Sequence, residues 1–262
     1  GVYSNPIGID AKKLAKQIDD PTVGQLKQMI KERWAGRQLI VNRDKLDRLR
    51  GVKQKLLAYE IFLKKYPDYV NKVSFIQICL KSNNYDTDLE YEIMTIVERI
   101  NSMSTDFTVS QPVVFLHQDI DFQQYLALIS VADTFIVSTM REGMNLTCHE
   151  FIVATEEKKS PLILSEFTGS AHLFQQGALL INPWNLNQIA NEIHQALTMS
   201  LEEKTNRWNN LYKVLTNKNC YKWVSNSLTE IQHAWDKQQE RSNTKSLNLN
   251  NSRFIGVYHE SK

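Results

Sequence analysis

Few features of this sequence point to a specialised environment or partner. Its three cysteines, Cys79, Cys148 and Cys220, are scattered and lack the spacing of a metal site, which predicts reduced thiols packed as small apolar groups in a cytoplasmic protein. No apolar run is long enough to span a bilayer, and residues 1–10 lack the charged-then-apolar pattern of a signal peptide. The formal net charge is only +2, so neither nucleic acid nor a membrane surface is an expected partner.

The usual catalytic signatures are scarce as well. The sequence contains no Walker loop, no set of zinc ligands and no Ser/His/Asp arrangement. His117 ends a predicted strand, where it either lines a ligand site or serves as a structural histidine, and His149 is expected to pack or to cap. We therefore expect neither a metal ion nor a cofactor.

What the sequence does contain is a regular alternation of apolar runs and helical patterns. Strand-like runs occupy residues 38–41, 73–78, 113–116, 134–137, 162–164 and 179–181, and helical periodicity appears at 53–65, 89–100, 122–131 and 146–155. This alternation predicts an α/β fold with a Rossmann-like, doubly wound parallel sheet. In such folds ligands bind at the carboxyl ends of the strands.

The C-terminal part differs from this middle region. Residues 186–235 are nearly all helical in pattern, whereas residues 237–252 are rich in Asn, Ser and Lys and are predicted to form a linker. The short apolar run at 254–258 is a possible start of another domain. The predicted division of the chain is 1–36 with entry helices, 37–236 with the Rossmann-like domain and its C-terminal helices, and 237–262.

The strand-to-helix segment at 136–150 is suited to bind an anion. A strand ends, a loop carries Gly143, and a helix then starts. Unpaired N–H groups and the helix dipole favour a phosphate there, and Gly143 lets a ligand approach the backbone. Glu150 lies one turn into the helix, where it can accept hydrogen bonds from sugar hydroxyls. The alternative is a plain turn with a solvated Glu142.

Two further segments follow predicted strands. Residues 44–51 bring three cations, which suit a diphosphate, to the same sheet edge: Lys45, Arg48 and Arg50. The alternative is a charged surface loop capped by Asp44 or Asp47. Residues 164–171 are small and include a glycine, which fits either close packing near a ligand or a simple tight connection.

Together these segments resemble the C-terminal half of trehalose-6-phosphate synthases over about residues 5–235. Five motifs occur in the family's order: NPIGID at 5–10, RGVKQKL at 50–56, EGMNL at 142–146, LSEFTGSA at 164–171 and NPWN at 182–185. The resemblance implies the C-terminal domain of a GT-B glycosyltransferase fold, which binds UDP-glucose. The N-terminal domain of the family binds glucose 6-phosphate, and the reaction is retaining glucosyl transfer without a metal. Residues 1–36 would include the end of that N-terminal domain, and the rest of it would lie outside this chain.

The resemblance assigns roles to site residues, and three of them depart from the family pattern. Active members have Arg at the position of Lys45 and Lys at that of Arg50, a pair that grips the diphosphate and assists the leaving group. They have Asp, against the transferred glucose, at the position of Glu142. Glu150 matches the glutamate that holds the ribose, and the phosphate-binding turn is matched by Gly143, Met144, Asn145 and Leu146. Exchanged cations and a displaced carboxylate imply a degenerate catalytic set that still binds the sugar nucleotide.

The stretch MREGMNLTCHEF at 140–151 is most similar to the fungal regulatory subunits of the trehalose synthase complex, which belongs to trehalose biosynthesis and the stress response. Those proteins join a synthase-like to a phosphatase-like region and hold the synthase and phosphatase subunits together. If 254–258 is the first strand of such a phosphatase-like region, residues 258–260 lack the aspartate nucleophile. Three functions stay open: an assembly subunit, an active UDP-glucose:glucose-6-phosphate glucosyltransferase, and a sensor of UDP-glucose. The substitutions at Lys45, Arg50 and Glu142 favour the first and the third.

Overall fold

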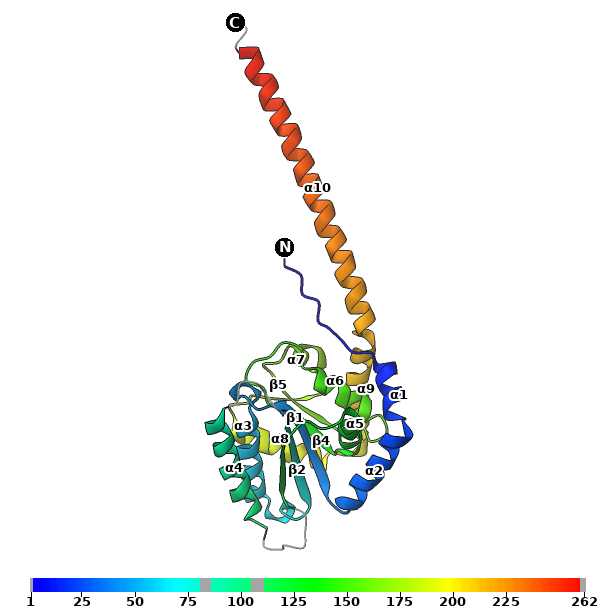
Figure 1. Ribbon diagram of the computed structural model, residues 1–262, viewed down its shortest axis with the longest axis vertical. Coiled ribbons are helices and arrows are strands. Elements are labelled where there is room, and N and C mark those ends of the chain that lie inside the picture. Colours follow the sequence, from blue (N-terminus) through cyan, green and yellow to red (C-terminus); the bar gives the residue numbers. More distant parts are fainter. Residues whose placement is uncertain (1, 81–85, 105–110, 260–262) are drawn as a thin grey trace.

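Six parallel strands form one sheet in the computed structural model, which describes residues 2–80, 86–104 and 111–259 (Figure 1). The strands are β1 (Gln38–Lys45), β2 (Val73–Leu80), β3 (Val113–His117), β4 (Thr134–Val137), β5 (Leu162–Ser165) and β6 (Leu179–Ile181). Their spatial order is β3-β2-β1-β4-β5-β6, and each neighbouring pair is parallel. The predicted Rossmann-like, doubly wound α/β fold is confirmed.

Helices cover both faces of this sheet (Figure 1). One face is covered by α3 (Val52–Lys65), α4 (Thr87–Asn101) and α8 (Leu186–Thr198). The other is covered by α1 (Ala11–Ile18), α2 (Pro21–Arg33), α5 (Phe122–Val131), α6 (Leu146–Ala154) and α9 (Leu201–Asn217). The short helices η1 (Arg48–Arg50), η2 (Pro67–Tyr69) and α7 (Gly169–Phe174) lie in connections. Since α2 contacts α5 and α1 contacts α6, the entry helices share the core of the sheet domain.

The strands supply two cores because side chains alternate along each strand. In β1, Leu39 and Val41 belong to the core under α5 and α6, whereas Ile40 belongs to the core under α3 and α8. In β4, Phe135 and Ile136 divide in the same way. Burial on both faces requires nearly continuous apolar runs, and this is why all six strands were visible in the sequence.

The strand β1 is longer than its apolar run. It pairs with β2 from Gln38 to Lys45, so Asp44 and Lys45 lie on the strand and not in the loop after it, which corrects the sequence prediction. The buried position of Asp44 is tolerated because Lys55 on α3 neutralises its carboxylate. Backbone pairing with β2 therefore continues beyond the apolar residues of β1.

The C-terminal region is helical where a linker was predicted. The helix α10 (Cys220–His259) leaves the body as a long rod (Figure 1), so the strand proposed at 254–258 is wrong and residues 237–252 are not irregular. Lys, Gln, Glu and Arg are good helix formers, and a polar composition shows only that a segment faces water. In the described part of the chain, no helix is both long and apolar enough to cross a membrane.

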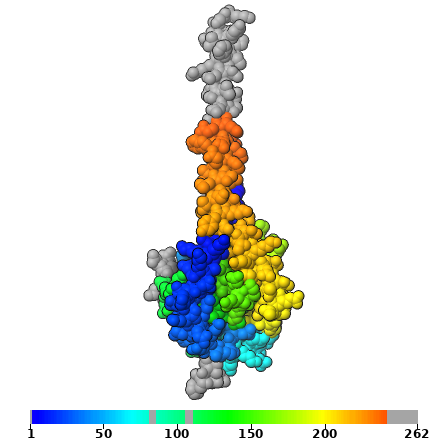
Figure 2. Space-filling view, turned by 90° about the vertical axis from the view of Figure 1, so that its right-hand side faces the viewer, coloured from blue at the N-terminus to red at the C-terminus, as the bar shows by residue number. Residues whose placement is uncertain are grey.

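The N-terminal segment runs beside the first turns of α10 (Figure 2). The Asn5 side-chain amide donates to the Trp223 carbonyl oxygen and to Ser227 Oγ, each at 2.8 Å. The Trp223 indole N–H donates back to the Asn5 carbonyl oxygen at 3.1 Å. The Tyr221 hydroxyl donates to Asp10 Oδ2 at 2.6 Å. These bonds hold residues 5–10 against α10, so the two ends of the described chain leave the body on the same side (Figure 1).

Candidate functional site

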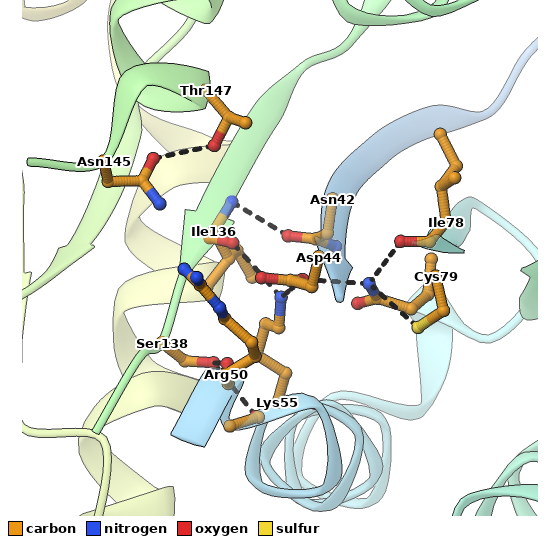
Figure 3. A network of polar contacts seen from close by, with 12 residues as sticks. Asn42, Asp44, Arg50, Lys55, Ile78, Cys79, Ile136, Ser138, Asn145 and Thr147 are labelled. Atoms are coloured by element: carbon orange, nitrogen blue, oxygen red, sulfur yellow. Dashed lines mark hydrogen bonds and ion pairs between the residues drawn. The ribbon is translucent and has the colours of Figure 1, made fainter. Parts of the chain in front are cut away.

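The two central strands separate toward their carboxyl ends. β1 and β4 pair only over residues 40–41 and 134–135. Beyond that point the Asn42 side-chain oxygen accepts the Ile136 N–H at 3.0 Å in place of a strand carbonyl (Figure 3). The chain leaves β1 toward α3 on one face and leaves β4 toward α6 on the other. This edge is the topological switch point of the sheet, where doubly wound folds bind ligands.

A buried ion pair lies under the switch point (Figure 3). Lys55 Nζ is 2.5 Å from Asp44 Oδ2, and the two side chains are 0% and 5% exposed. Asp44 also accepts a hydrogen bond from Gln77 Nε2 at 2.9 Å. This pair ties the end of β1 to α3, and the sequence pattern does not predict it. The available signal was a lysine placed among the apolar residues of the predicted helix at 53–65.

A tight loop connects β1 to α3. Asp47 caps η1 by accepting the Arg50 N–H at 2.9 Å, which agrees with the cap considered as an alternative. Gly51 has φ +67°, and a Cβ there would overlap the Ser138 carbonyl oxygen. The Ser138 hydroxyl donates to the Gly51 carbonyl oxygen at 3.0 Å. This close approach joins the loop after β1 to the segment after β4.

Arg50 and Glu142 form an ion pair at the switch point. The second carboxylate oxygen of Glu142 accepts from Asn145 Nδ2 at 2.9 Å. Asn145 also caps α6, because its Oδ1 accepts the Cys148 N–H at 3.0 Å. The prediction that segment 142–150 lies beside Arg50 is confirmed. The alternative of a solvated Glu142 is wrong, since its side chain is only 15% exposed.

Residues 165–171 support the turn at 143–146 from behind. The Gly169 N–H donates to the Gly143 carbonyl oxygen at 2.7 Å, and the Ser170 hydroxyl accepts the Asn145 N–H at 3.0 Å. A Cβ on Gly143 would meet nothing within 4 Å, so packing within the protein does not demand a glycine there. Space at this backbone is consistent with the predicted approach of a ligand.

Glu150 lies beside a buried tyrosine and an arginine. Its Oε2 accepts from the Tyr125 hydroxyl at 2.9 Å, and the guanidinium carbon of Arg43 lies 4.6 Å from the centre of the Tyr125 ring. Burial raises the pKa of Glu150 above its ordinary value, while the Tyr125 hydrogen bond and the charge of Arg43 oppose that shift. The sequence predicts Glu150 as a site residue but neither Tyr125 nor Arg43, because the spacing of these residues gives no sign that they meet.

The predicted cations do not all join the site. Arg48 forms ion pairs with the α4 cap Asp86 and with Glu92 on α4, at 3.0 and 3.6 Å, so its charge is already paired within the protein. Lys45 is exposed at the end of β1 and forms no ion pair with any residue that the structure describes. Of the three predicted cations, Arg50 therefore contacts the loop at 142–146, and Lys45 stays open to solvent.

Both histidines considered from the sequence have protein partners. His117 Nδ1 is 2.6 Å from Glu90 Oε1 on α4. His149 is buried in contact with the ring of Phe174, and burial lowers the pKa of its imidazole to about 4. Of the two roles predicted for His117, the contact with Glu90 fits the structural one. His149 packs in the core, as expected.

Comparison with known proteins agrees with this geometry. The model of glycosyltransferase family 20 matches residues 1–233. Over 261 residues the chain is 51% identical to the trehalose synthase complex regulatory subunit TSL1 of Saccharomyces cerevisiae, with all of this chain and 24% of that protein covered. Over 243 residues it is 35% identical to the 56 kDa subunit of the UDP-forming alpha,alpha-trehalose-phosphate synthase of the same yeast, with 92% and 49% covered.

Solved structures show the same fold. The N-terminal domain of trehalose-6-phosphate phosphatase from Candida albicans superimposes with a TM-score of 0.84 at 35% identity, over 87% of this chain and 49% of that chain. A UDP-forming alpha,alpha-trehalose-phosphate synthase from Burkholderia xenovorans, in complex with glucose-6-phosphate, gives 0.81 at 27% identity, over 88% and 51%. The chain thus spans about half of these solved chains and about a quarter of TSL1.

Proposed function

Because the chain belongs to glycosyltransferase family 20, we propose that it is a non-catalytic regulatory and assembly part of a complex that makes trehalose through trehalose 6-phosphate. The ion pair between Arg50 and Glu142 carries this proposal. The family resemblance gives these two positions the diphosphate and the transferred glucose as partners, yet here they neutralise each other. The 51% identity to a protein named as a regulatory subunit supports the same role.

UDP or UDP-glucose is the proposed ligand of the switch point. The turn at 143–146 keeps the residues of the family pattern, and α6 begins directly after it with its N–H groups toward the loop. Tyr125 engages only Oε2 of Glu150, so Oε1 accepts no hydrogen bond within the described residues and is available to a ribose hydroxyl. These features support nucleotide binding without turnover.

The start of α10 supports a role within a larger assembly. Its exposed apolar side chains are between 47% and 67% accessible: Tyr221, Val224, Leu228, Ile231 and Trp235. Alternating spacings of three and four place them on one face of the helix. An exposed apolar stripe of this kind marks a contact surface. The proposed partners are trehalose-6-phosphate synthase and phosphatase subunits in the cytoplasm.

Nucleotide binding is expected to be weak and sensitive to salt. Two cations near a helix start predict a Kd for UDP of roughly 0.1–1 mM, or about 4–5.5 kcal/mol, and screening weakens it as salt rises. Replacing Glu150 with lysine should abolish binding, because the ribose contact is lost and a cation is placed beside Arg43. Isothermal titration calorimetry with UDP up to several millimolar measures both effects.

The matched control for this measurement is Glu157→Lys, which makes the same charge change at an exposed position after α6. This variant should bind UDP as the wild-type chain does. Neither heat nor a thermal shift with the wild-type chain would show that the switch point has lost its ligand and that the fold acts only as a scaffold.

The chain is expected to form no trehalose 6-phosphate from UDP-glucose and glucose 6-phosphate. Arg50 is paired with Glu142, and Lys45 cannot reproduce the bidentate contact of an arginine. Mass spectrometry of the product after long incubation measures this directly. Steady product formation above the rate without protein, in pure material, would instead favour an active glucosyltransferase.

A further inference from the structure

The Arg43 guanidinium has no hydrogen-bond acceptor among the residues that the structure describes. Its Nε is buried and has no hydrogen-bond partner, and the side chain donates no hydrogen bond to any residue that the structure describes. Its guanidinium carbon lies 4.6 Å from the centre of the Tyr125 ring, and its charge acts on Glu150. A buried donor left unpaired destabilises the fold by an amount comparable to a lost hydrogen bond. The arrangement therefore needs a reason other than stability.

The position of Arg43 places it at the switch point. Side chains alternate along a strand, so Arg43 and Lys45 lie on the same side of β1, while Asp44 between them turns to α3 and binds Lys55. Arg43 stacks on the tyrosine whose hydroxyl donates to Glu150. The guanidinium is therefore next to the glutamate that the family resemblance assigns to the ribose.

Other cations near the switch point are already engaged. Arg50 pairs with Glu142 and lies 3.8 Å from Asp47, and Arg48 pairs with carboxylates of the α4 start. Within the described residues, Arg43 and Lys45 are the two cations of strand β1 that keep donors for a ligand. One of these two is an arginine, which can present two parallel N–H groups to one anion.

We propose that Arg43 is the guanidinium that grips the diphosphate of a bound nucleotide, in place of the arginine that active synthases carry at the position of Lys45. Positions 43 and 45 are two residues apart on β1 and lie on the same side of the strand. The site therefore keeps one arginine, which is shifted toward the ribose-binding Glu150. Because Arg50 is tied to Glu142, it is not the first guanidinium available to the ligand. This inference rests on the proposed function, since it names the residue that holds the proposed ligand.

The test compares UDP with uridine, which lacks the diphosphate. Replacing Arg43 with methionine should weaken UDP binding by roughly tenfold or more, since a charge-assisted bidentate contact is lost, and should change uridine binding by less than about twofold. Adding Lys45→Arg to the Arg43→Met variant should restore UDP binding, because a guanidinium returns to the same side of β1. Calorimetry measures UDP binding, and ligand-observed NMR measures uridine binding.

The matched control is Arg33→Met, which removes an arginine stacked 4.8 Å from the ring centre of Trp34 on α2 and should leave UDP binding unchanged. If Arg43→Met proves too unstable to titrate, Arg43→Lys takes its place. This variant keeps the charge but loses the paired N–H groups of the guanidinium, and it should bind UDP more weakly than the wild type. If the Arg43→Met variant binds UDP with the affinity of the wild type, this inference is overturned and the proposed function is left intact. Absence of UDP binding by the wild-type chain would overturn this inference together with the proposed nucleotide ligand, and would leave the assembly role.

Discussion

Replacing Lys55 with methionine is expected to lower the free energy of unfolding by about 3–5 kcal/mol. Methionine keeps most of the apolar stem but removes the ammonium group 2.5 Å from Asp44 Oδ2. The Asp44 carboxylate then stays buried with the Gln77 amide as its remaining side-chain donor. An uncompensated buried charge is among the most destabilising changes available to a core. Urea unfolding followed by circular dichroism at neutral pH measures the loss.

Lys64→Met is the matched control on the same helix. Lys64 pairs with Glu60 at 2.6 Å, but its side chain is 63% exposed, so its loss should change stability by no more than about 1 kcal/mol. A double variant, Lys55→Met with Asp44→Leu, should recover much of the stability because no charge is left in the core. Similar losses for Lys55→Met and Lys64→Met would contradict the role given to the buried pair.

Gly51→Ala is expected to lower the free energy of unfolding by about 3 kcal/mol. A left-handed backbone accounts for about 1–2 kcal/mol of this loss, and the overlap of the new Cβ with the Ser138 carbonyl oxygen adds on the order of 1–3 kcal/mol of overpacking. The substitution should also move Arg50 relative to Glu142. Thermal unfolding of the purified variant measures the first effect.

Gly36→Ala separates the two causes. Gly36 has φ +78°, close to that of Gly51, but a Cβ there would meet nothing within 4 Å. This variant should lose only the backbone contribution of about 1–2 kcal/mol. If Gly36→Ala and Gly51→Ala were equally destabilised, the close approach to Ser138 would have no energetic importance.

The fold was predictable because its signals are local and repeated. Strands buried on both faces need apolar runs such as residues 134–137, and helices on those faces need a period of 3.6. The predictions failed where polar residues continue a regular element. β1 continues through Asp44, which pairs with β2 and is neutralised by Lys55, whereas the apolar run ends at Val41. At the C-terminus, the polar composition of residues 237–252 predicts a linker, but the backbone is helical there, since several polar residue types are good helix formers.

The sequence predicted several residues of the candidate site but not the contacts between them. Gly143 and Glu150 follow from a strand-to-helix turn and from the family resemblance, and both lie at the switch point. The contact of Arg50 with Glu142 joins residues that are 92 positions apart, and Arg43 meets Tyr125 across a similar separation. Sequence spacing carries no information on such contacts, because they depend on how the strand order places β1 beside β4.

The ion pair at the switch point makes Glu142 a tethered competitor of any nucleotide. The Gly51–Ser138 contact holds the segments of Arg50 and Glu142 together, so the carboxylate faces the guanidinium at an effective concentration on the order of millimolar or more. A nucleotide phosphate with the same intrinsic affinity for Arg50 as the carboxylate displaces it only when the nucleotide concentration reaches that range. Occupancy of Arg50 by a ligand would therefore change across high nucleotide concentrations, where the tight site of an active enzyme is already saturated.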